Sequence, residues 1–198
     1  MLPDQIKKFI DAFSRLPSIG PRLATRLAFY LSSTDKNELN EIESAIAGLK
    51  NLNRCPRCFF VKGSGKFCSI CLDPKRDKYL IAVVEKDTDL MSIEKTGVWA
   101  GQYLVLGELV EHGAPDPSMK LKLQNLLSRI KNELSGSAEE IVIALAPTTF
   151  GDFTAQVVTE NLKGFSKKIT RLGRGIPTGG EIEFADEETL GHALKSRS

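Results

Sequence analysis

Four cysteines in two identically spaced pairs constrain this chain more than any other feature of its sequence. Cys55 and Cys58 form the first pair, and Cys68 and Cys71 form the second after nine intervening residues. Two residues between cysteines let both thiolates of a pair reach one ion, and two such pairs close a tetrahedron around it. The spacing therefore predicts one structural zinc ion per chain, with no open position for a catalytic water.

Two disulfides are the alternative use of four cysteines, and they require an oxidising compartment. The chain opens with Met1, Leu2 and Pro3 and shows no apolar secretory segment, which favours zinc. Its 198 residues, 41% of them hydrophobic, are enough for a buried core, and the longest apolar runs are too short to cross a bilayer. We therefore expect a globular cytoplasmic protein.

The N-terminal segment reads as two helices joined by a tight turn. Apolar residues at helical spacing predict an amphipathic helix over 3–14, and Leu23, Leu27 and Leu31 share one face of a second helix. The turn between them contains Pro17 and Gly20, so the arrangement resembles a helix-hairpin-helix motif. Such a hairpin offers backbone N–H groups at a helix N-terminus to a DNA phosphate.

Arg22 and Arg26 lie four residues apart on the second helix and favour a phosphate-binding hairpin. A plain αα-hairpin is the alternative. Ser18 stands where the family hairpin usually has its first glycine, and serine is strained there if the position needs positive φ. A further helix over 36–52 leads to Cys55.

From Tyr79 onward the pattern changes to alternating strands and helices. We expect strands at 79–84, 103–106, 140–146 and 168–172, and helices at 87–95, 118–134 and 151–162. Repeated βα units with apolar strands predict a mainly parallel sheet covered by helices on both faces. No P-loop motif occurs, and His112 and His192 are isolated.

Charge is unevenly distributed, although the formal net charge is only +2. Residues 55–78 carry six Lys or Arg against two Asp, and residues 163–180 carry five Lys or Arg and no acid. Basic segments beside a zinc site are compatible with a polyanionic partner, while a solvated surface is the commoner meaning of any single charged run.

Five sequence segments in a fixed order point to one protein family. They are residues 16–27, the four cysteines, Val83-Val84-Glu85 followed by Asp89 and Glu94, residues 147–155 and residues 173–186. Together they resemble the RecR family of bacterial recombination mediators over nearly the whole chain. The expected architecture is a helical helix-hairpin-helix domain (1–54), a four-cysteine zinc finger (55–78), an α/β Toprim domain (79–172) and a C-terminal extension (173–198).

The resemblance implies a DNA-binding protein that takes part in recombinational repair and is not an enzyme. It implies RecO and RecF as partners in loading recombinase onto gapped DNA. It also implies homo-oligomers, either a dimer or a clamp-like tetramer around DNA, with the tail from Gly173 supporting ring closure.

The Toprim resemblance also admits a second function, a Mg²⁺-dependent nuclease or topoisomerase-like enzyme. Catalytic Toprim domains carry a Glu after the first strand and Asp-x-Asp after a later one; Glu85 fits the first, but only Asp152 fits the second, and Phe150 replaces the other acid. Glu85, Asp89 and Asp152 then form an acidic patch for partner docking or weak Mg²⁺ binding, with a solvated surface as the alternative.

The C-terminal extension resembles a Walker B-like segment. Its characteristic residues are Arg174, Gly175, Pro177, Gly179, Gly180 and Asp186. Because there is no Walker A motif, we expect a Gly/Pro-rich turn followed by an exposed strand that pairs with a neighbouring subunit, in preference to nucleotide binding.

Overall fold

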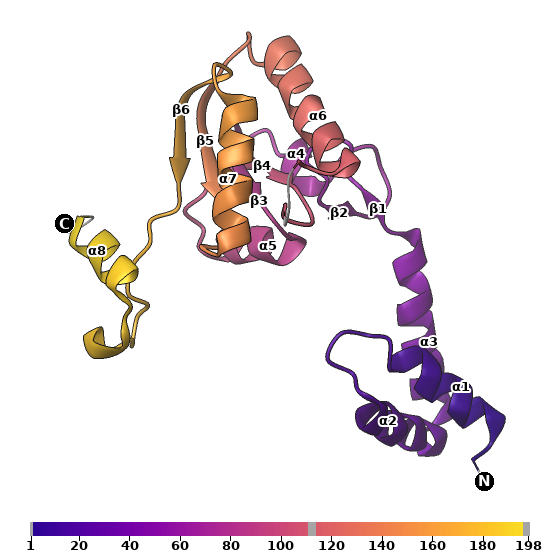
Figure 1. Cartoon of the computed structure of the whole chain (residues 1–198). Coiled ribbons are helices and arrows are strands. Elements are labelled where there is room, and N and C mark those ends of the chain that lie inside the picture. The colour runs from indigo at the N-terminus through magenta and orange to yellow at the C-terminus, as the bar shows by residue number, and fades with distance from the viewer. Residues whose placement is uncertain (1, 111–113, 196–198) are drawn as a thin grey trace. The chain divides into compact units, whose positions relative to one another are not determined.

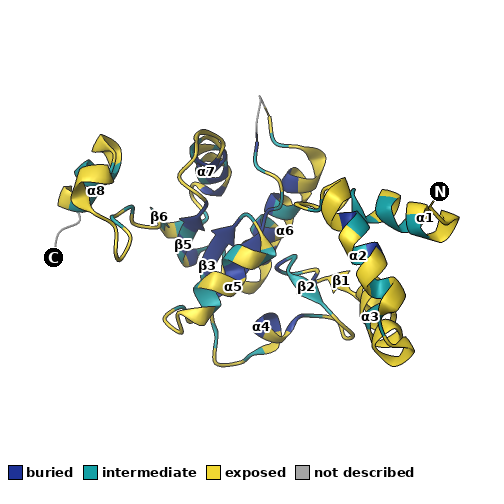
Figure 2. Ribbon diagram, turned by 90° about the horizontal axis from the view of Figure 1, so that it is seen from below, coloured by how far each residue is buried: buried dark blue, intermediate teal, exposed yellow. Residues whose placement is uncertain are grey.

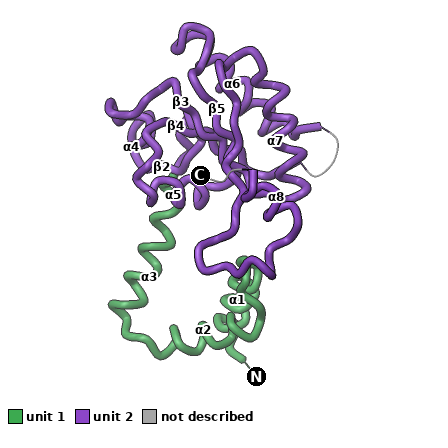
Figure 3. The backbone as a smooth tube through the Cα atoms, turned by 90° about the vertical axis from the view of Figure 1, so that its left-hand side faces the viewer, with its two compact units in different colours: residues 1–52 green, residues 53–198 purple. Residues whose placement is uncertain are grey.

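The computed structural model describes residues 2–110 and 114–195, so that His112 lies outside the described residues (Figure 1). The chain forms two compact units, residues 1–52 and residues 53–198 (Figure 3). Within the described residues, no helix combines the length and the apolarity needed to cross a membrane.

The first unit consists of helices. Helix α1 spans Asp4–Phe13, α2 spans Pro21–Ser33 and α3 spans Lys36–Gly48, and α3 continues into a short 3-10 turn, η1 (Leu49–Asn51). Helix α1 packs along α2, and the rings of Phe9 and Phe13 stack with their centroids 3.9 Å apart. The buried positions of α2 are Ala24 and Ala28, whereas Leu23 stays 41% exposed. The helices were thus predicted correctly, but the most buried positions of α2 are two alanines, while Leu27 and Leu31 are only partly buried.

The turn between α1 and α2 holds Ser18 in a backbone conformation that glycine adopts more easily than serine. Ser18 has a φ of 63°, and the N–H of Ile19 donates to the carbonyl of Leu16 at 3.1 Å. Pro21 is the first residue of α2, where its missing N–H costs nothing. The strain predicted for serine at this position is therefore present.

The second unit is built on a parallel sheet. In the described residues its strands are β3 (Asp77–Val84), β4 (Gly101–Val105), β5 (Ala138–Ala144) and β6 (Ser166–Arg171), in the order β4-β3-β5-β6. Each neighbouring pair is parallel, with Val83 beside both Leu104 and Ile143. The expectation of a parallel sheet with crossover helices is confirmed.

Helices cover both faces of this sheet. Ile81 and Val83 pack with α6 (Pro117–Glu133) and α7 (Thr149–Leu162), in a core that is buried throughout (Figure 2). Ala82 and Val84 face the opposite way and pack with Leu90 of α5 (Asp87–Lys95) and with the four cysteines. The alternation of side chains along β3 thus joins two cores, one helical and one containing the cysteine cluster.

The cysteines belong to a small module that is joined to the edge strand β4. Strands β1 (Asn53–Arg54) and β2 (Val61–Lys62) form an antiparallel hairpin, and α4 (Ser69–Leu72) follows. The N–H of Val105 in β4 donates to the carbonyl of Cys58 at 2.8 Å. The module therefore satisfies part of the open edge of the sheet.

The tail differs from the sequence prediction. Its described residues form a short 3-10 turn, η2 (Ile182–Phe184), and a helix, α8 (Glu187–Lys195), where an exposed strand was expected. The strand prediction was wrong: Ile182–Phe184 turns as η2, although both Ile182 and Phe184 are mostly exposed. Asp186 instead starts a helix by accepting a hydrogen bond from the N–H of Thr189 at 2.8 Å.

Candidate functional site

The four cysteines are brought together as the spacing predicts. All are buried, and their Sγ atoms lie within 4.8 Å of one another. Tetrahedral zinc with Zn–S bonds of about 2.3 Å places its sulfurs roughly 3.8 Å apart, so the cluster matches the size of a metal site. The Sγ atoms of Cys58 and Cys68 are 3.4 Å apart, far beyond the length of a disulfide bond of about 2.05 Å.

Local backbone bonds shape the first cysteine pair. The N–H of Cys55 donates to the carbonyl of Phe60 at 2.8 Å, and the N–H of Phe59 donates to the carbonyl of Cys55 at 2.9 Å. The N–H of Cys68 points at Cys55 Sγ at 3.4 Å, the kind of donor that stabilises a thiolate ligand. Hydrogen bonds from the Cys58 and Cys71 thiols lower the pKa of Cys68, so the cluster already favours one thiolate.

The hairpin leaves two cations on the exposed surface of α2. Arg22 and Arg26 are both exposed and lie one turn apart, within the first two turns of the helix. The N-cap is Gly20, which has no side chain with which to cap the first N–H groups. Free N–H groups and the positive end of the helix dipole therefore lie next to two guanidinium groups, an arrangement suited to a phosphate.

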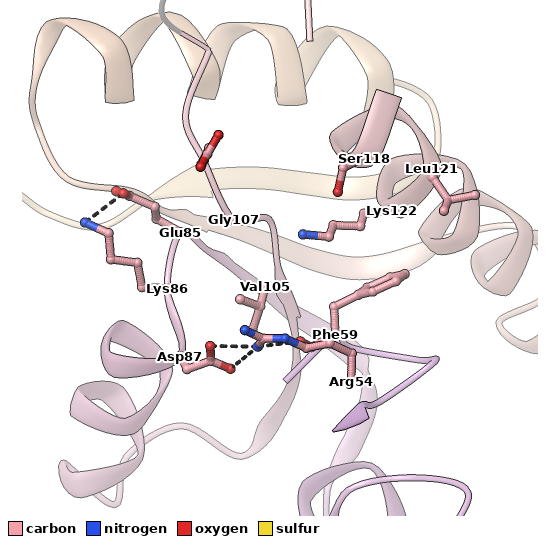
Figure 4. A pocket seen from close by; sticks show the side chains of 11 residues that line it. Arg54, Phe59, Glu85, Lys86, Asp87, Val105, Gly107, Ser118, Leu121 and Lys122 are labelled. Carbon is pink, nitrogen blue, oxygen red and sulfur yellow. Dashed lines mark hydrogen bonds and ion pairs between the residues drawn. The ribbon is translucent and has the colours of Figure 1, made fainter. Parts of the chain in front are cut away.

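The carboxyl ends of β3 and β5 carry the predicted acidic residues. Glu85 follows β3, is 13% exposed at its side chain and pairs with Lys86 at 2.9 Å (Figure 4). Asp89 accepts a hydrogen bond from the N–H of Lys86 at 2.9 Å and so caps α5. Two of the three acids are thus engaged by neighbouring groups of the same chain.

Asp152 is held by two arginines. It lies in the first turn of α7, 2.5 Å from a guanidinium nitrogen of Arg171, at the end of β6, and 2.5 Å from one of Arg174, at the start of the tail. The guanidinium of Arg174 also pairs with Glu188 of α8. The arginine charges, with Arg171 the larger influence, hold the pKa of Asp152 below its usual value. The pattern of acids alone does not reveal these partners.

A pocket of about 500 Å³ lies beside Glu85 (Figure 4). Arg54 and Asp87 pair across it at 2.6 Å, and the Lys122 ammonium donates to the carbonyl of Leu106. Burial lowers the pKa of Lys122 from its usual value. Sequence reasoning missed this pocket, because its lining comes from β1, α5 and α6, which meet only in the fold.

The Walker B-like residues of the tail have structural roles in this arrangement. The N–H of Gly180 closes a turn on the carbonyl of Pro177 at 2.8 Å, and Gly179 has a φ of 85°. Asp186 caps α8 by accepting a hydrogen bond from the N–H of Thr189, and this hydrogen bond lowers the pKa of Asp186. Arg174 anchors the tail through Asp152, and Gly175 follows it directly.

Comparison with known proteins gives matches along most of the chain. Family models match residues 6–49 (RecR, helix-hairpin-helix), 80–173 (Toprim domain) and 175–198 (RecR, C-terminal). A protein of Chloroflexus aurantiacus named Recombination protein RecR is 39% identical over 97% of this chain and 93% of its own length. Proteins of the same name from Bifidobacterium longum and Nocardia farcinica are 39% and 38% identical, over 97% and 100% of this chain and 94% and 98% of their own lengths.

Proposed function

Because this chain belongs to the RecR family of recombination proteins, and its domains fit a mediator of recombinational DNA repair, we propose that it binds DNA without regard to sequence. In this role it acts with RecO and RecF to load recombinase onto gapped DNA. The observation that carries the proposal is the exposed hairpin of α2, where Arg22 and Arg26 lie beside an uncapped helix N-terminus. Contacts of this kind position a protein on the backbone and read no bases.

A single hairpin of this size binds weakly, so the proposal includes self-association. Subunits form a dimer or tetramer that closes as a clamp around DNA, and several hairpins then act at high effective concentration. Ile182, Phe184 and Leu194 of the tail are each more than 60% exposed, and such side chains are suited to burial against another copy.

The cysteine cluster holds one structural zinc ion per chain in this proposal. Four thiolates complete the coordination of zinc, so the metal supplies folding energy and no catalysis. The sulfur separations and the burial of all four side chains support this assignment. The ion joins the hairpin of β1 and β2 to α4 and keeps the module against β4.

The protein acts as a mediator and not as an enzyme. A Toprim nuclease or topoisomerase-like activity is the competing function, favoured by Glu85 at the end of β3. Phosphoryl transfer of that kind needs clustered carboxylates that are available to Mg²⁺. Asp152 is engaged by Arg171 and Arg174, whose positive charges stand where a divalent cation would have to bind. Incubation of DNA with Mg²⁺ tests this: cleavage or relaxation that disappears with Glu85→Ala contradicts the non-enzymatic role.

The acidic residues at the carboxyl end of the sheet have a different role in this proposal. Glu85, Asp89 and Asp152 mark a docking surface for a protein partner. The proposed DNA partner and the bacterial relatives support a cytoplasmic location.

A recombinase-loading assay tests the proposed function. Gapped DNA coated with single-strand-binding protein is incubated with recombinase, RecO and RecF, and recombinase filaments are measured with and without this protein. We expect stimulation by the parent and its loss in the Arg22→Ala/Arg26→Ala variant. The matched control, Lys8→Ala/Lys36→Ala, removes two exposed cations elsewhere in the same unit. Equal stimulation by both double variants would exclude the hairpin as the DNA contact.

A further inference from the structure

Arg129, a buried cation in α6, makes no ion pair with an acid among the described residues. The side chain of Arg129 is in the core, with the residue only 7% exposed. One guanidinium nitrogen, Nη2, donates to Gln102 Oε1 at 2.6 Å and reaches the carbonyl of Lys78 at 3.5 Å. Within the described residues the other terminal nitrogen, Nη1, has no hydrogen-bond partner. Among the described residues, only neutral oxygens therefore accept hydrogen bonds from this guanidinium.

Taking a charge out of water is costly unless an opposite charge lies nearby. The acid nearest along the helix is Glu133, one turn further on, and its carboxylate pairs with Arg57 at 2.9 Å. No carboxylate among the described residues lies within 4.0 Å of Arg129. Among these residues, no carboxylate in direct contact balances the positive charge of Arg129.

The cysteine module is bonded to both elements that hold this arginine, α6 and β4. Arg57 sits between Cys55 and Cys58, so its pair with Glu133 places the last turns of α6 against the first cysteine pair. On the other side, β4 provides Gln102 to Arg129 and bonds to the carbonyl of Cys58 through Val105. Helix α6 and strand β4 therefore hold Arg129 at the border of the cysteine module.

A zinc ion with four thiolates carries two net negative charges, and these also need compensation in a buried site. Burial, and after it the charge of Arg57, lower the pKa of Arg129, while the negative charges of Cys71, Glu133 and Cys58 oppose that shift. Arg57 is paired with Glu133, whereas Arg129 makes no ion pair among the described residues. Of the two arginines at this border, Arg129 is therefore the one without a carboxylate in contact.

We propose that Arg129 is the buried counter-cation of the zinc–tetrathiolate centre and strengthens zinc binding without contacting the metal. The inference rests on the proposed zinc site and goes beyond it, since it assigns a tuning role to a residue of the α/β unit. It also explains why an arginine occupies a core position of α6: metal binding and packing of α6 on the sheet stabilise each other.

Zinc retention by the folded protein tests the role of Arg129. Zinc-loaded parent and variants are mixed with a chromogenic chelator, and both the transfer rate and the equilibrium affinity are measured. We expect Arg129→Met, which keeps the apolar stem and removes the charge, to weaken zinc affinity by about 10- to 100-fold. Arg129→Lys keeps the charge and should stay within about threefold of the parent, as should Lys120→Met, which removes an exposed cation from the same helix.

The alternative is that Arg129 only ties α6 to β3 and β4 through its hydrogen bonds. In that case Arg129→Met lowers the stability of zinc-loaded and zinc-free protein alike, and zinc affinity is unchanged, which overturns the proposal. If Arg129→Met does not fold, Arg129→Gln, which keeps hydrogen-bond donors and removes the charge, is compared with Arg129→Lys: a tenfold or greater loss of zinc affinity in the glutamine variant alone supports the counter-cation, and equal affinities of the two variants contradict it. A parent that binds no zinc would contradict the metal site itself, a result distinct from equal zinc binding by parent and variant.

Discussion

Replacing Glu94 by glutamine tests how the cysteine module is fastened to the sheet. Arg76 lies in the segment that leaves the module, and its guanidinium donates to both carboxylate oxygens of Glu94 in α5 and to the carbonyl of Gly101. The hydroxyl of Tyr103, a fully buried residue of β4, donates to the same carboxylate at 2.5 Å. One carboxylate thus joins the module, a helix and the edge strand.

The size of the effect follows from exposure and bond count. The side chains of Arg76 and Glu94 are 16% and 25% exposed, so solvent screens the pair only partly. A hydrogen bond to a charged group contributes about 1.5–3 kcal/mol, and glutamine keeps one of the two acceptor oxygens. Glu94→Gln should therefore lower the free energy of unfolding of the second unit by about 2 kcal/mol at neutral pH.

The lowered pKa of Glu94 determines how this loss of stability changes with pH. Arg76, and after it Tyr103, lower the pKa of Glu94 from its ordinary value of 4.5. A lowered carboxyl pKa adds stability above the unfolded pKa and loses it as pH falls through the folded pKa. The difference between parent and Glu94→Gln should be constant from pH 8 to pH 5.5 and shrink below about pH 4.5.

Urea unfolding, followed by tryptophan fluorescence of Trp99, measures the loss at each pH. The matched control is Glu139→Gln, because Glu139 pairs with Lys167 at 2.5 Å in the same unit but both side chains are more than half exposed. The control should lose no measurable stability. If Glu94→Gln behaves like the control, or if it loses the same free energy of unfolding at pH 7 and pH 4, the Glu94 carboxylate does not stabilise the unit in this way.

Three further predictions concern the hairpin, the cysteines and the tail. Ser18→Gly relieves a positive φ and should raise the stability of the first unit by up to about 1 kcal/mol in thermal unfolding, whereas an unchanged or lower stability would mean that the turn is unstrained. Cys58→Ser should abolish stoichiometric zinc, as measured by metal analysis, and loosen the module; zinc retained at one per chain would exclude a four-cysteine site. Arg174→Met removes the link between Asp152 and Glu188 and should speed proteolysis of the tail; an unchanged cleavage rate would show that other contacts hold α8.

Much of the second unit could be predicted because local patterns and tertiary packing agree there. Strand β3 is apolar along its last four residues, and each of them is buried in one of two cores. The helix expected over 87–95 matches α5 residue for residue. Cysteine spacing predicted the cluster because two residues between ligands impose a geometry that hardly depends on the rest of the fold.

Features that depend on partners from distant segments were not predictable. Arg129 looks like a surface residue in the sequence of α6, but its side chain lies in the core and donates to Gln102 of β4. Asp152 reads as a metal ligand until Arg171 and Arg174 are placed beside it. In α2 the leucine pattern predicted one buried face, but packing with α1 buries Ala24 and Ala28 most deeply and leaves Leu23 exposed.

The salt dependence of DNA binding tests whether Arg22 and Arg26 contact DNA phosphates. Equilibrium affinity is measured for two duplexes of unrelated sequence across a range of salt concentrations, with the parent and the Arg22→Ala/Arg26→Ala variant. Each phosphate contact adds about 0.9 to the slope of log affinity against log salt. We predict superimposable curves for the two duplexes and a slope lower by about 1.8 per engaged hairpin in the variant. A slope and affinity that are unchanged in the variant, or a strong preference for one sequence, would contradict this prediction.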